Sequence, residues 1–427
     1  MKHITAFLAA LVTLTAMSVF AQNSKLDGGV QPEPEAVDDE STSVNPAQEL
    51  VGLLERAKEL ALELEGQQEV ETQFNPFADR AADRINESAL KLYQKLPAGE
   101  NVVFSPLSLY QAFSIVYMGA KNETAKQFRN AIDLDLFAPE YNFNSPELQT
   151  ANAVWLFDEK IQLEESFLDA INEVGEDVFR KIKPDNALDT INGWFNEKTK
   201  GRIPKLFDKL DENAKLVIGN AVYFKGQWEE PFEKELTDDR PFYALDGKEQ
   251  KVPMMHNNLH TWYGKGKDYA AIGLPYKGNR YSMCVILPDK GVDFKKIKEQ
   301  IEEIITETTG TLRDVELSLP KFEIESTFDL ETVLTAAGVT DAFDNEKADF
   351  SGMTGEVGLM IGQAIQKANI TVNEEGTVAA AATGIEMKVM SAAPEEEPVV
   401  FNADRPFIYY IIDNETRLIV FVGDKVK

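Results

Sequence analysis

The chain has 427 residues, 43% of them hydrophobic, which allows one large domain or two to three ordinary ones with a substantial core. Its 72 acidic and 43 basic residues give a formal net charge of −29, which argues against nucleic acid and membrane surfaces as partners. A single cysteine, Cys284, excludes an internal disulfide.

The N-terminus has the composition of an export signal. Lys2 and His3 precede an apolar run that extends to Phe20, and Ala21 supplies a small residue at the expected cleavage point. We therefore predict a signal peptide over residues 1–21 and a secreted, extracellular protein, periplasmic if the source is bacterial. No other segment is apolar over the length that a membrane span needs.

Residues 22–73 form a predicted acidic N-terminal extension. Its first half is polar and is expected to be disordered. A helix is predicted over about 46–65, because Asn45 can cap it, Pro46 suits its first position and Gly66 can end it. Its apolar seam consists of Leu50, Leu54, Ala57, Ala61 and Leu64. Such a seam suits weak packing on the protein's own body, binding of a partner or self-association.

Residues 74–427 alternate helical and strand-like blocks without a repeat or long linker, which predicts one α+β domain. A helix is expected over residues 106–118. The predicted strands cover residues 151–157, 216–224, 283–287, 315–319 and 419–422.

The sequence lacks the usual signatures of an enzyme. After the signal peptide the only histidines are His256 and His260, and neither a Gly-x-Ser-x-Gly nor a His-Glu-x-x-His motif occurs. Walker and dinucleotide-binding glycine motifs are also missing. We expect a protein that is not an enzyme and that needs no cofactor or metal.

A strict alternation of side chains marks the C-terminal part of the chain. From residue 377 the odd-numbered positions are small or apolar: Thr377, Ala379, Ala381, Thr383, Ile385, Met387 and Val389. Period two suits a strand with one buried face. Four consecutive alanines and Gly384 nevertheless form strands poorly. The pattern alone fits an edge strand, an alanine-rich helix, or a loop that can join an existing sheet.

This region resembles a known family. Residues 374–383 resemble the reactive-loop hinge of inhibitory serpins, and residues 401–409 resemble the signature that follows the loop. Further family-like runs are residues 101–108, 220–228, 274–278 and 319–322. The resemblance covers residues 74–427 in the family's order, so the chain is identified as a member of the serpin (serine protease inhibitor) family, of the inhibitory type.

The resemblance implies a serpin fold with three β-sheets, eight or nine helices and an exposed reactive-centre loop at about residues 374–400. It implies a suicide-substrate inhibitor that forms a covalent complex with a serine protease and is itself a monomer. The cut loop would enter the central sheet and trap the acyl-enzyme. The alternative is a non-inhibitory serpin that acts as a carrier or chaperone. Such relatives commonly carry bulky or charged hinge residues, which this chain lacks.

Roles for individual residues follow from the same resemblance. The hinge would comprise Glu374, Glu375, Gly376, Thr377, Ala379, Ala380, Ala381, Ala382 and Thr383. Glu374, Lys321 and Trp228 match the breach, at the top of the central sheet. Asn101, Ser105, Ser108, Asn220 and Gln366 match the shutter, a polar cluster beneath the parting strands. Gln366 stands where the family often has a histidine.

The family spacing places the reactive bond between Met390 and Ser391, with cleavage after Met387, Lys388 or Val389 left open by the extra length before Phe401. The predicted targets are elastase-, chymotrypsin- or subtilisin-like proteases. Breakers replace the usual heparin-binding helix between residues 133 and 147, so heparin is not an expected ligand. Sequons at Asn86, Asn122 and Asn414 are potential glycosylation sites.

Overall fold

The computed structural model describes residues 76–97, 99–137, 145–157, 161–175, 177–211, 214–377 and 397–427. The chain divides into two units, Met1–Gln73 and Phe74–Lys427, and the described residues all belong to the second. The predicted signal peptide and the predicted helix at about 46–65 lie outside the described residues.

The described part contains nine α-helices, which agrees with the predicted eight or nine. They are α3 (Pro76–Gln94), α4 (Pro106–Tyr117), α5 (Asn122–Ile132), α6 (Glu165–Val174), α7 (Ala187–Lys198), α8 (Phe294–Glu299), α9 (Ile301–Glu307), α10 (Leu330–Ala337) and α11 (Ser351–Thr354). None of these described helices combines the length and apolar character that a membrane crossing requires.

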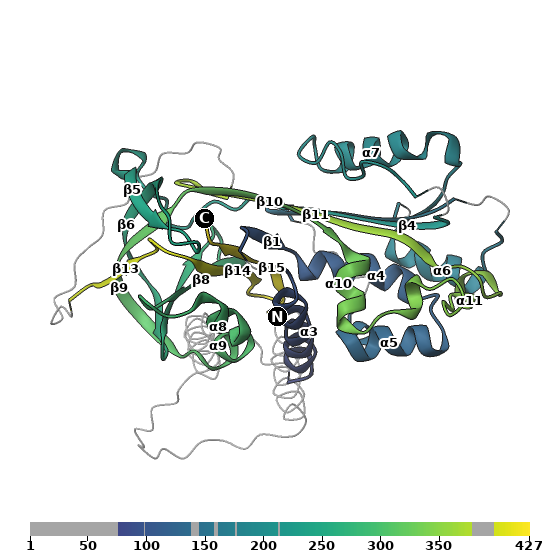
Figure 1. The fold of residues 1–427 in the computed structure, drawn as a ribbon, viewed down its shortest axis with the longest axis horizontal. Helices are drawn as coiled ribbons and strands as arrows, with labels where there is room; N and C mark the ends of the chain where they lie inside the picture. Colours follow the sequence, from purple (N-terminus) through teal and green to yellow (C-terminus); the bar gives the residue numbers. More distant parts are fainter. Residues whose placement is uncertain are drawn as a thin grey trace, which may run out of the picture. The chain divides into compact units, whose positions relative to one another are not determined.

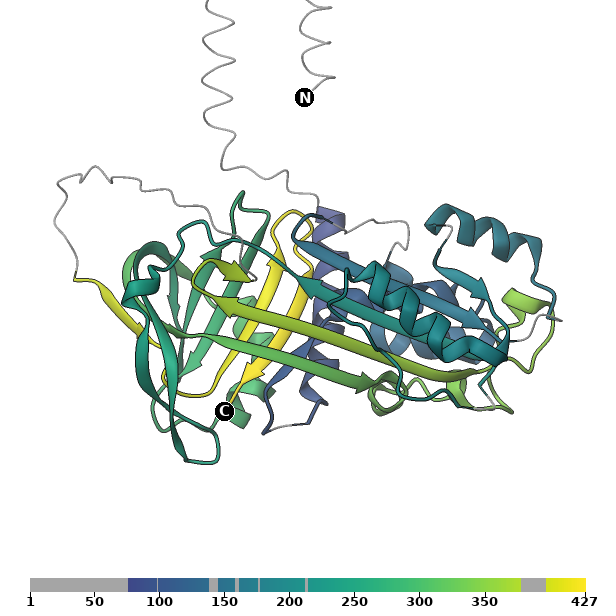
Figure 2. The same ribbon diagram turned by 90° about the horizontal axis from the view of Figure 1, so that it is seen from above.

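Six strands form the first sheet: β10 (Phe322–Asp329), β11 (Ile361–Asn373), β4 (Leu216–Phe224), β2 (Leu148–Leu156) and β3 (Phe179–Lys181) in that order, with β12 (Gly376–Thr377) paired to β11. Strands β4 and β11 run parallel. Helix α7 lies over one face of the sheet and α4 lies on the opposite face (Figure 1). Viewed from above, the long strands run side by side beneath α7 (Figure 2).

The two faces of this sheet belong to different apolar clusters. Even-numbered residues of β4, such as Ile218 and Val222, pack in the main core with α4. Odd-numbered residues, such as Val217 and Ala221, pack with Phe195 of α7. Because both faces are covered, all nine residues of β4 are buried.

Nine strands form the second sheet: β1 (Val102–Phe104), β15 (Ile419–Lys425), β14 (Phe407–Asp413), β8 (Tyr281–Pro288), β7 (Tyr269–Pro275), β6 (Glu249–Lys265), β9 (Gly310–Pro320) and β13 (Val399–Asn402) in that order, with β5 (Asp238–Tyr243) paired to β6. Strand β6 is 17 residues long and pairs with β9 along most of its length and with β7 through Tyr263 to Lys265. Hydrogen bonding through β6 therefore joins two of the three expected sheets into one.

Local sequence accounts for the helix at the centre of the molecule. Ser105 adopts an extended conformation and its hydroxyl accepts a hydrogen bond from the Ser108 backbone amide, while Pro106 occupies the first turn. The helix predicted over 106–118 forms as α4. The strand predicted over 216–224 forms as β4, and the other four predicted strands correspond to β2, β8, β9 and β15.

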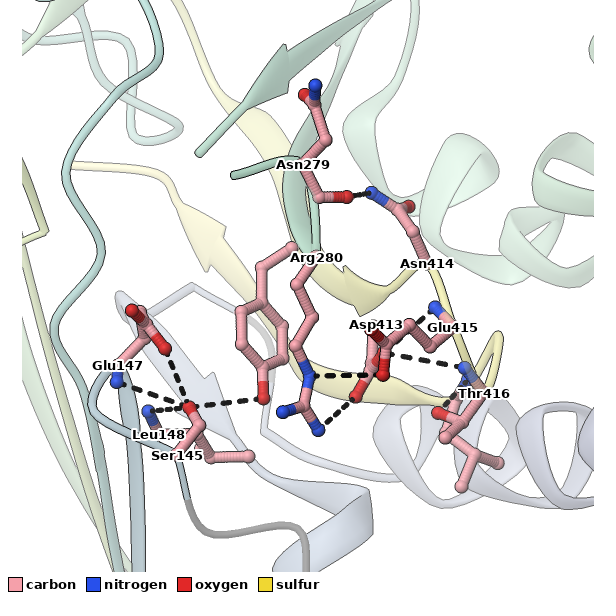
Figure 3. Close-up of polar contacts among 11 residues, drawn as sticks. Ser145, Glu147, Leu148, Asn279, Arg280, Asp413, Asn414, Glu415 and Thr416 are labelled. Atoms are coloured by element: carbon pink, nitrogen blue, oxygen red, sulfur yellow. Dashed lines mark hydrogen bonds and ion pairs between the residues drawn. The ribbon is translucent and has the colours of Figure 1, made fainter. Parts of the chain in front are cut away.

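The connection from α5 to β2 agrees with the expectation of a missing helix, as far as it is described. Residues 133–137 contain only the 3-10 turn η1 (Leu134–Leu136), residues 145–147 contain no helix, and residues 138–144 lie outside the described part. Ser145 anchors the entry to β2, because its hydroxyl accepts from the backbone amides of Glu147 and Leu148 at 3.1 and 3.0 Å (Figure 3).

A buried ion pair fastens α3 and α8 to the second sheet. Lys298 Nζ lies 2.6 Å from Asp424 Oδ2, with side-chain exposures of 5% and 0%. The Tyr93 hydroxyl donates to the other Asp424 oxygen, and the Lys298 ammonium lies 4.2 Å from the centre of the Tyr93 ring. Hydrogen bonds and the cation–π contact thus compensate both charges in a buried site.

Candidate functional site

Strands β4 and β11 part at one end of the first sheet. Their parallel pairing ends at Tyr223 and Asn369, although β11 continues to Asn373. Strand β12 then folds back antiparallel to β11, with Thr377 opposite Val372. Because β10 already pairs with Val372 along the other edge of β11, β12 must occupy the edge that faces β4.

The opposite side of β12 is held by the segment that follows β4. Gly376 forms an isolated bridge with Gln227, and the Thr377 amide donates to the Gly226 carbonyl at 2.6 Å. Gly376 has a φ of 141°, and a Cβ there would lie 2.1 Å from the Gly226 oxygen. Only glycine fits this position. The first two residues of a strand therefore already lie in the gap between β11 and the β4 side.

Thr377 is fully buried in this gap, and its hydroxyl lies 2.8 Å from the Tyr276 hydroxyl. Tyr276 stacks on Trp228, with ring centres 4.5 Å apart and planes inclined by 14°. Burial raises the pKa of Tyr276, so the phenol stays protonated and able to hydrogen-bond. The Trp228 ring nitrogen donates to the Asn373 carbonyl at 2.9 Å, which ties the aromatic pair to the end of β11.

Glu374 forms an ion pair with Lys321. Lys321 Nζ lies 2.8 Å from Glu374 Oε2, and the Thr237 hydroxyl donates to Oε1 at 2.9 Å. Burial alone would raise the pKa of Glu374, but the hydrogen bonds from Lys321, the backbone and Thr237 outweigh it and lower this pKa. The structure thus places Glu374, Lys321 and Trp228 at the same end of the sheet.

A buried polar cluster lies between the sheet and α4, further along β4 and β11. The Gln366 side chain accepts from the Ser105 amide at 3.0 Å and donates to the Ser105 carbonyl at 2.9 Å. The Asn220 amide nitrogen donates to the carbonyl and the hydroxyl oxygen of Ser108, both at 2.6 Å. The cluster joins β4 and β11 to the start of α4, and Gln366 is one of its members.

Asn101 does not lie in this cluster, so its predicted place in the shutter is wrong. Its side-chain oxygen accepts from the amides of Val426 and Lys427 at 2.8 and 3.0 Å, and its nitrogen donates to the Lys427 carbonyl. The reason is strand pairing: Asn101 directly precedes β1, and Val102 pairs with Asp424 near the end of β15. The residue therefore fastens the last residues of the chain.

Three residues of the site were missed by the sequence analysis. Asn152 accepts from the Ser108 hydroxyl at 3.1 Å and from Asn220, while Tyr276 and Thr237 contact the hinge as described above. A polar Asn152 between Ala151 and Ala153 in a predicted buried strand was a signal for a polar cluster. Tyr276 lies in the family-like run 274–278, which did not assign it a role, and Thr237 offered no comparable local signal.

The remaining predicted residues either fall outside the described part of the chain or make contacts elsewhere in the fold. Ala379 to Thr383 and the predicted reactive bond at Met390 and Ser391 lie outside the described residues. Of the sequon asparagines, Asn86 donates to the Arg417 carbonyl and Asn122 to Asp349. Asn414 donates to the Asn279 carbonyl at 2.8 Å (Figure 3). A glycan on any of these nitrogens would compete with that contact.

Comparison with known proteins identifies the family. The model of the family Serpin (serine protease inhibitor) matches residues 83–427. A leukocyte elastase inhibitor of Bos taurus is 37% identical over 364 residues, covering 78% of this chain and 94% of the relative. An uncharacterized serpin-like protein of Methanosarcina mazei is 34% identical over 372 residues, covering 80% and 86%.

Solved serpin structures match the fold of this chain. The thermophilic serpin tengpin in its native state superposes with a TM-score of 0.73 at 28% identity, covering 84% of this chain and 95% of tengpin. Serpin48 of the insect Tenebrio molitor gives a TM-score of 0.72 at 27% identity, covering 84% and 100%. The chain belongs to the serpin family, and the predicted α+β serpin fold is confirmed.

Proposed function

We propose that this chain is a secreted suicide-substrate inhibitor of serine proteases. The catalytic serine of the target attacks a bond in the loop that follows β12 and forms an acyl-enzyme. The cut loop then extends β12 into the first sheet between β11 and β4 and carries the protease along before deacylation. The protease carries out the bond cleavage. This chain supplies the loop that is cleaved, and insertion of that loop into the sheet provides the free energy that traps the protease.

The register of β12 on β11 carries this proposal. Continued beyond Thr377, it sets Ala379 opposite Ile370, Ala381 opposite Ala368, Thr383 opposite Gln366 and Ile385 opposite Ala364. These four partners on β11 are fully buried. The odd-numbered loop residues would thus face the main core. They are the small and apolar half of the alternation, as a strand with a buried face requires.

The energetics favour insertion once the loop is cut. At present β4 and β11 share one ladder of hydrogen bonds from Ile361 to Asn369 of β11. An antiparallel strand inserted between them would replace that ladder with two, one to β11 and one to β4. Ile385, Met387 and Val389 would be buried at roughly 1.5–3 kcal/mol for each side chain, several kcal/mol together.

The test is capture of the covalent complex. The protein is mixed with a panel of serine proteases, and the products are separated by denaturing electrophoresis and weighed by mass spectrometry. We expect a band that survives denaturation, with the mass of one protease plus the chain without its C-terminal fragment. Complete cleavage by every protease without such a band would overturn the proposal in favour of a non-inhibitory carrier or chaperone.

The residue before the cut should decide which proteases are inhibited. We propose cleavage between Met390 and Ser391, where the unbranched apolar methionine suits the primary pocket of elastase-, chymotrypsin- or subtilisin-like enzymes. Met390→Ala should slow inhibition of these enzymes by tenfold or more, in line with roughly 2–5 kcal/mol for losing a buried methionine side chain. Lys388→Ala is the matched control and should leave their inhibition rate unchanged.

The association rates of both variants are compared, and the C-terminal fragment is sequenced. Complexes that form only with trypsin, and that Lys388→Ala abolishes while Met390→Ala does not, would move the reactive bond to Lys388.

The organisation around this domain is also part of the proposal. Residues 1–21 would direct export and be removed, and residues 22–73 would remain as an acidic extension ahead of the serpin domain at 74–427. A free monomer would meet the protease outside the cell. The formal charge of −29 favours encounter with proteases whose active-site rim is basic, an effect that salt weakens.

A further inference from the structure

A small cavity lies where strands β6 and β7 diverge. The two strands pair only through Tyr263 to Lys265 of β6, and β7 then continues separately to Pro275. The segment that follows β4 crosses the gap between them. The Glu229 amide donates to the Pro275 carbonyl at 3.0 Å, and the Asn257 side-chain nitrogen donates to the Pro231 carbonyl at 3.1 Å. A cavity of about 30 Å³ remains between this segment and the two strands.

The walls of this cavity are mainly apolar. Trp228 and Phe232 line it from the crossing segment, Leu259 from β6 and Leu274 from β7, and all four are buried. Close-packed interiors leave few such voids, because the side chains around a void lose contacts there. The space accepts roughly two or three heavy atoms, which is the size of the tip of a branched aliphatic group.

The mouth of the cavity is polar and electronegative. His260 and Glu230 lie there, and both are exposed. His260 Nδ1 lies 2.9 Å from Asp314 Oδ1, and a carboxylate can only accept. Nδ1 therefore carries a proton, and the neutral ring offers Nε2 as an acceptor. None of the described residues that line the cavity is a lysine or an arginine. A positively charged donor suits this mouth, and a carboxylate does not.

We propose that this cavity binds a small primary amine with a branched aliphatic end, of which isobutylamine is a simple example. The aliphatic end fills the space against Trp228 and Phe232. The ammonium group, charged at pH 7, donates to His260 Nε2 and lies beside the Glu230 carboxylate.

The bound amine would also support the hinge, because the cavity walls hold it. The Phe232 amide donates to the Glu374 carbonyl at 2.8 Å, and Trp228 stacks on Tyr276, whose hydroxyl contacts Thr377. A ligand packed on Trp228 and Phe232 should therefore bind more tightly while β12 is seated in its gap. By linkage it favours the seated β12. That this state is the starting point of insertion rests on the proposed function.

The test measures binding of isobutylamine to the intact protein. The indole N–H resonance of Trp228, identified by its loss in Trp228→Phe, is followed by NMR during the titration, and the melting temperature is recorded. We expect a saturable shift and a higher melting temperature. Methylamine, which leaves the apolar space unfilled, should bind at least tenfold more weakly. Isobutyrate carries the same aliphatic end on a carboxylate and should cause no shift.

Variants locate the site and its link to the hinge. Leu259→Phe fills the cavity and should abolish the shift. Glu230→Gln removes a charge at the mouth and should weaken binding several-fold. Glu233→Gln is the matched control, because Glu233 is exposed on the same segment but does not line the cavity, and it should bind as the wild type does. Thr377→Arg, which should drive β12 out of its gap, should bind the amine more weakly.

A Trp228 resonance that does not shift, equal binding of isobutylamine and isobutyrate, or undiminished binding to Leu259→Phe would overturn the site. If Leu259→Phe does not fold, the comparison of the three ligands decides. Equal affinities of Thr377→Arg and the wild type would overturn the link to the hinge. None of these measurements uses a protease, so a chain that traps no protease would overturn the proposed function and leave the binding result unaffected.

Discussion

Thr377→Arg is expected to convert the protein from an inhibitor into a substrate. The Thr377 side chain is fully buried, its hydroxyl is bonded to Tyr276 and its amide to Gly226. A guanidinium there would have to shed its hydration without gaining a counter-charge, which is very costly. Strand β12 would be driven out of the gap, and insertion would lose its starting point.

The measurement is the fraction of variant that forms a complex stable to denaturation, against a protease that the wild type traps. We expect this fraction to fall by at least tenfold, with the loop cleaved at an undiminished rate. Thr377→Ser keeps a small side chain with a hydroxyl and should behave as the wild type. Complexes formed by Thr377→Arg at wild-type stoichiometry would contradict the role given to β12.

Lys298→Met is expected to destabilise the body of the molecule strongly. It leaves the carboxylate of Asp424, which has no exposed side-chain surface, without its counter-charge. Breaking a buried pair from one side typically reduces the free energy of unfolding by about 3–5 kcal/mol. Denaturant titration at pH 7 measures the loss. Lys248→Met at the exposed pair with Asp246 is the control and should change stability little.

The loss should depend on pH with a defined sign. Burial already raises the pKa of Asp424, and Lys298 acts against it. Without the ammonium this pKa rises further in the folded state. When the pKa of a carboxyl is higher in the folded state than in the unfolded state, its ionisation destabilises the fold. The stability is then fully present below the unfolded pKa and is lost as the pH rises through the folded pKa. The deficit of Lys298→Met should therefore shrink in acid, and adding Asp424→Asn should reduce it at pH 7. A deficit that grows in acid would contradict this explanation.

Local sequence signals were sufficient for the elements that position the site. Helix α4 follows from the cap at Ser105 and Pro106, and β4 follows from its mainly apolar run, which only Gly219 and Asn220 interrupt. The hinge was recognisable because it needs glycine and small residues in an order that few other structures require. The ion pair of Glu374 and Lys321 followed from the family resemblance and not from spacing, since 53 residues separate them.

The parts that the sequence did not reveal depend on long-range pairing. Asn101 was grouped with Ser105 because both lie in one short motif. Strand β1 separates them in the structure, so Asn101 contacts the end of the chain while Ser105 contacts Gln366. Tyr276 reaches Thr377 across 101 residues, and the register of β12 on β11 is fixed by the turn at Glu374 and Glu375. The union of two sheets through β6 depends on the three residue pairs between β6 and β7, which no local pattern marks.

Thermal unfolding of the intact and loop-nicked protein tests the central claim most directly. The loop is cut once near Met390 by a protease that is then removed, and both forms are melted under the same conditions. If the cut loop enters the sheet between β11 and β4, the nicked form exchanges the ladder of hydrogen bonds between these two strands for two ladders and buries a further set of side chains. It should then unfold at a markedly higher temperature than the intact form, and nicked Thr377→Arg should not. A nicked wild type that melts at or below the temperature of the intact protein would contradict loop insertion.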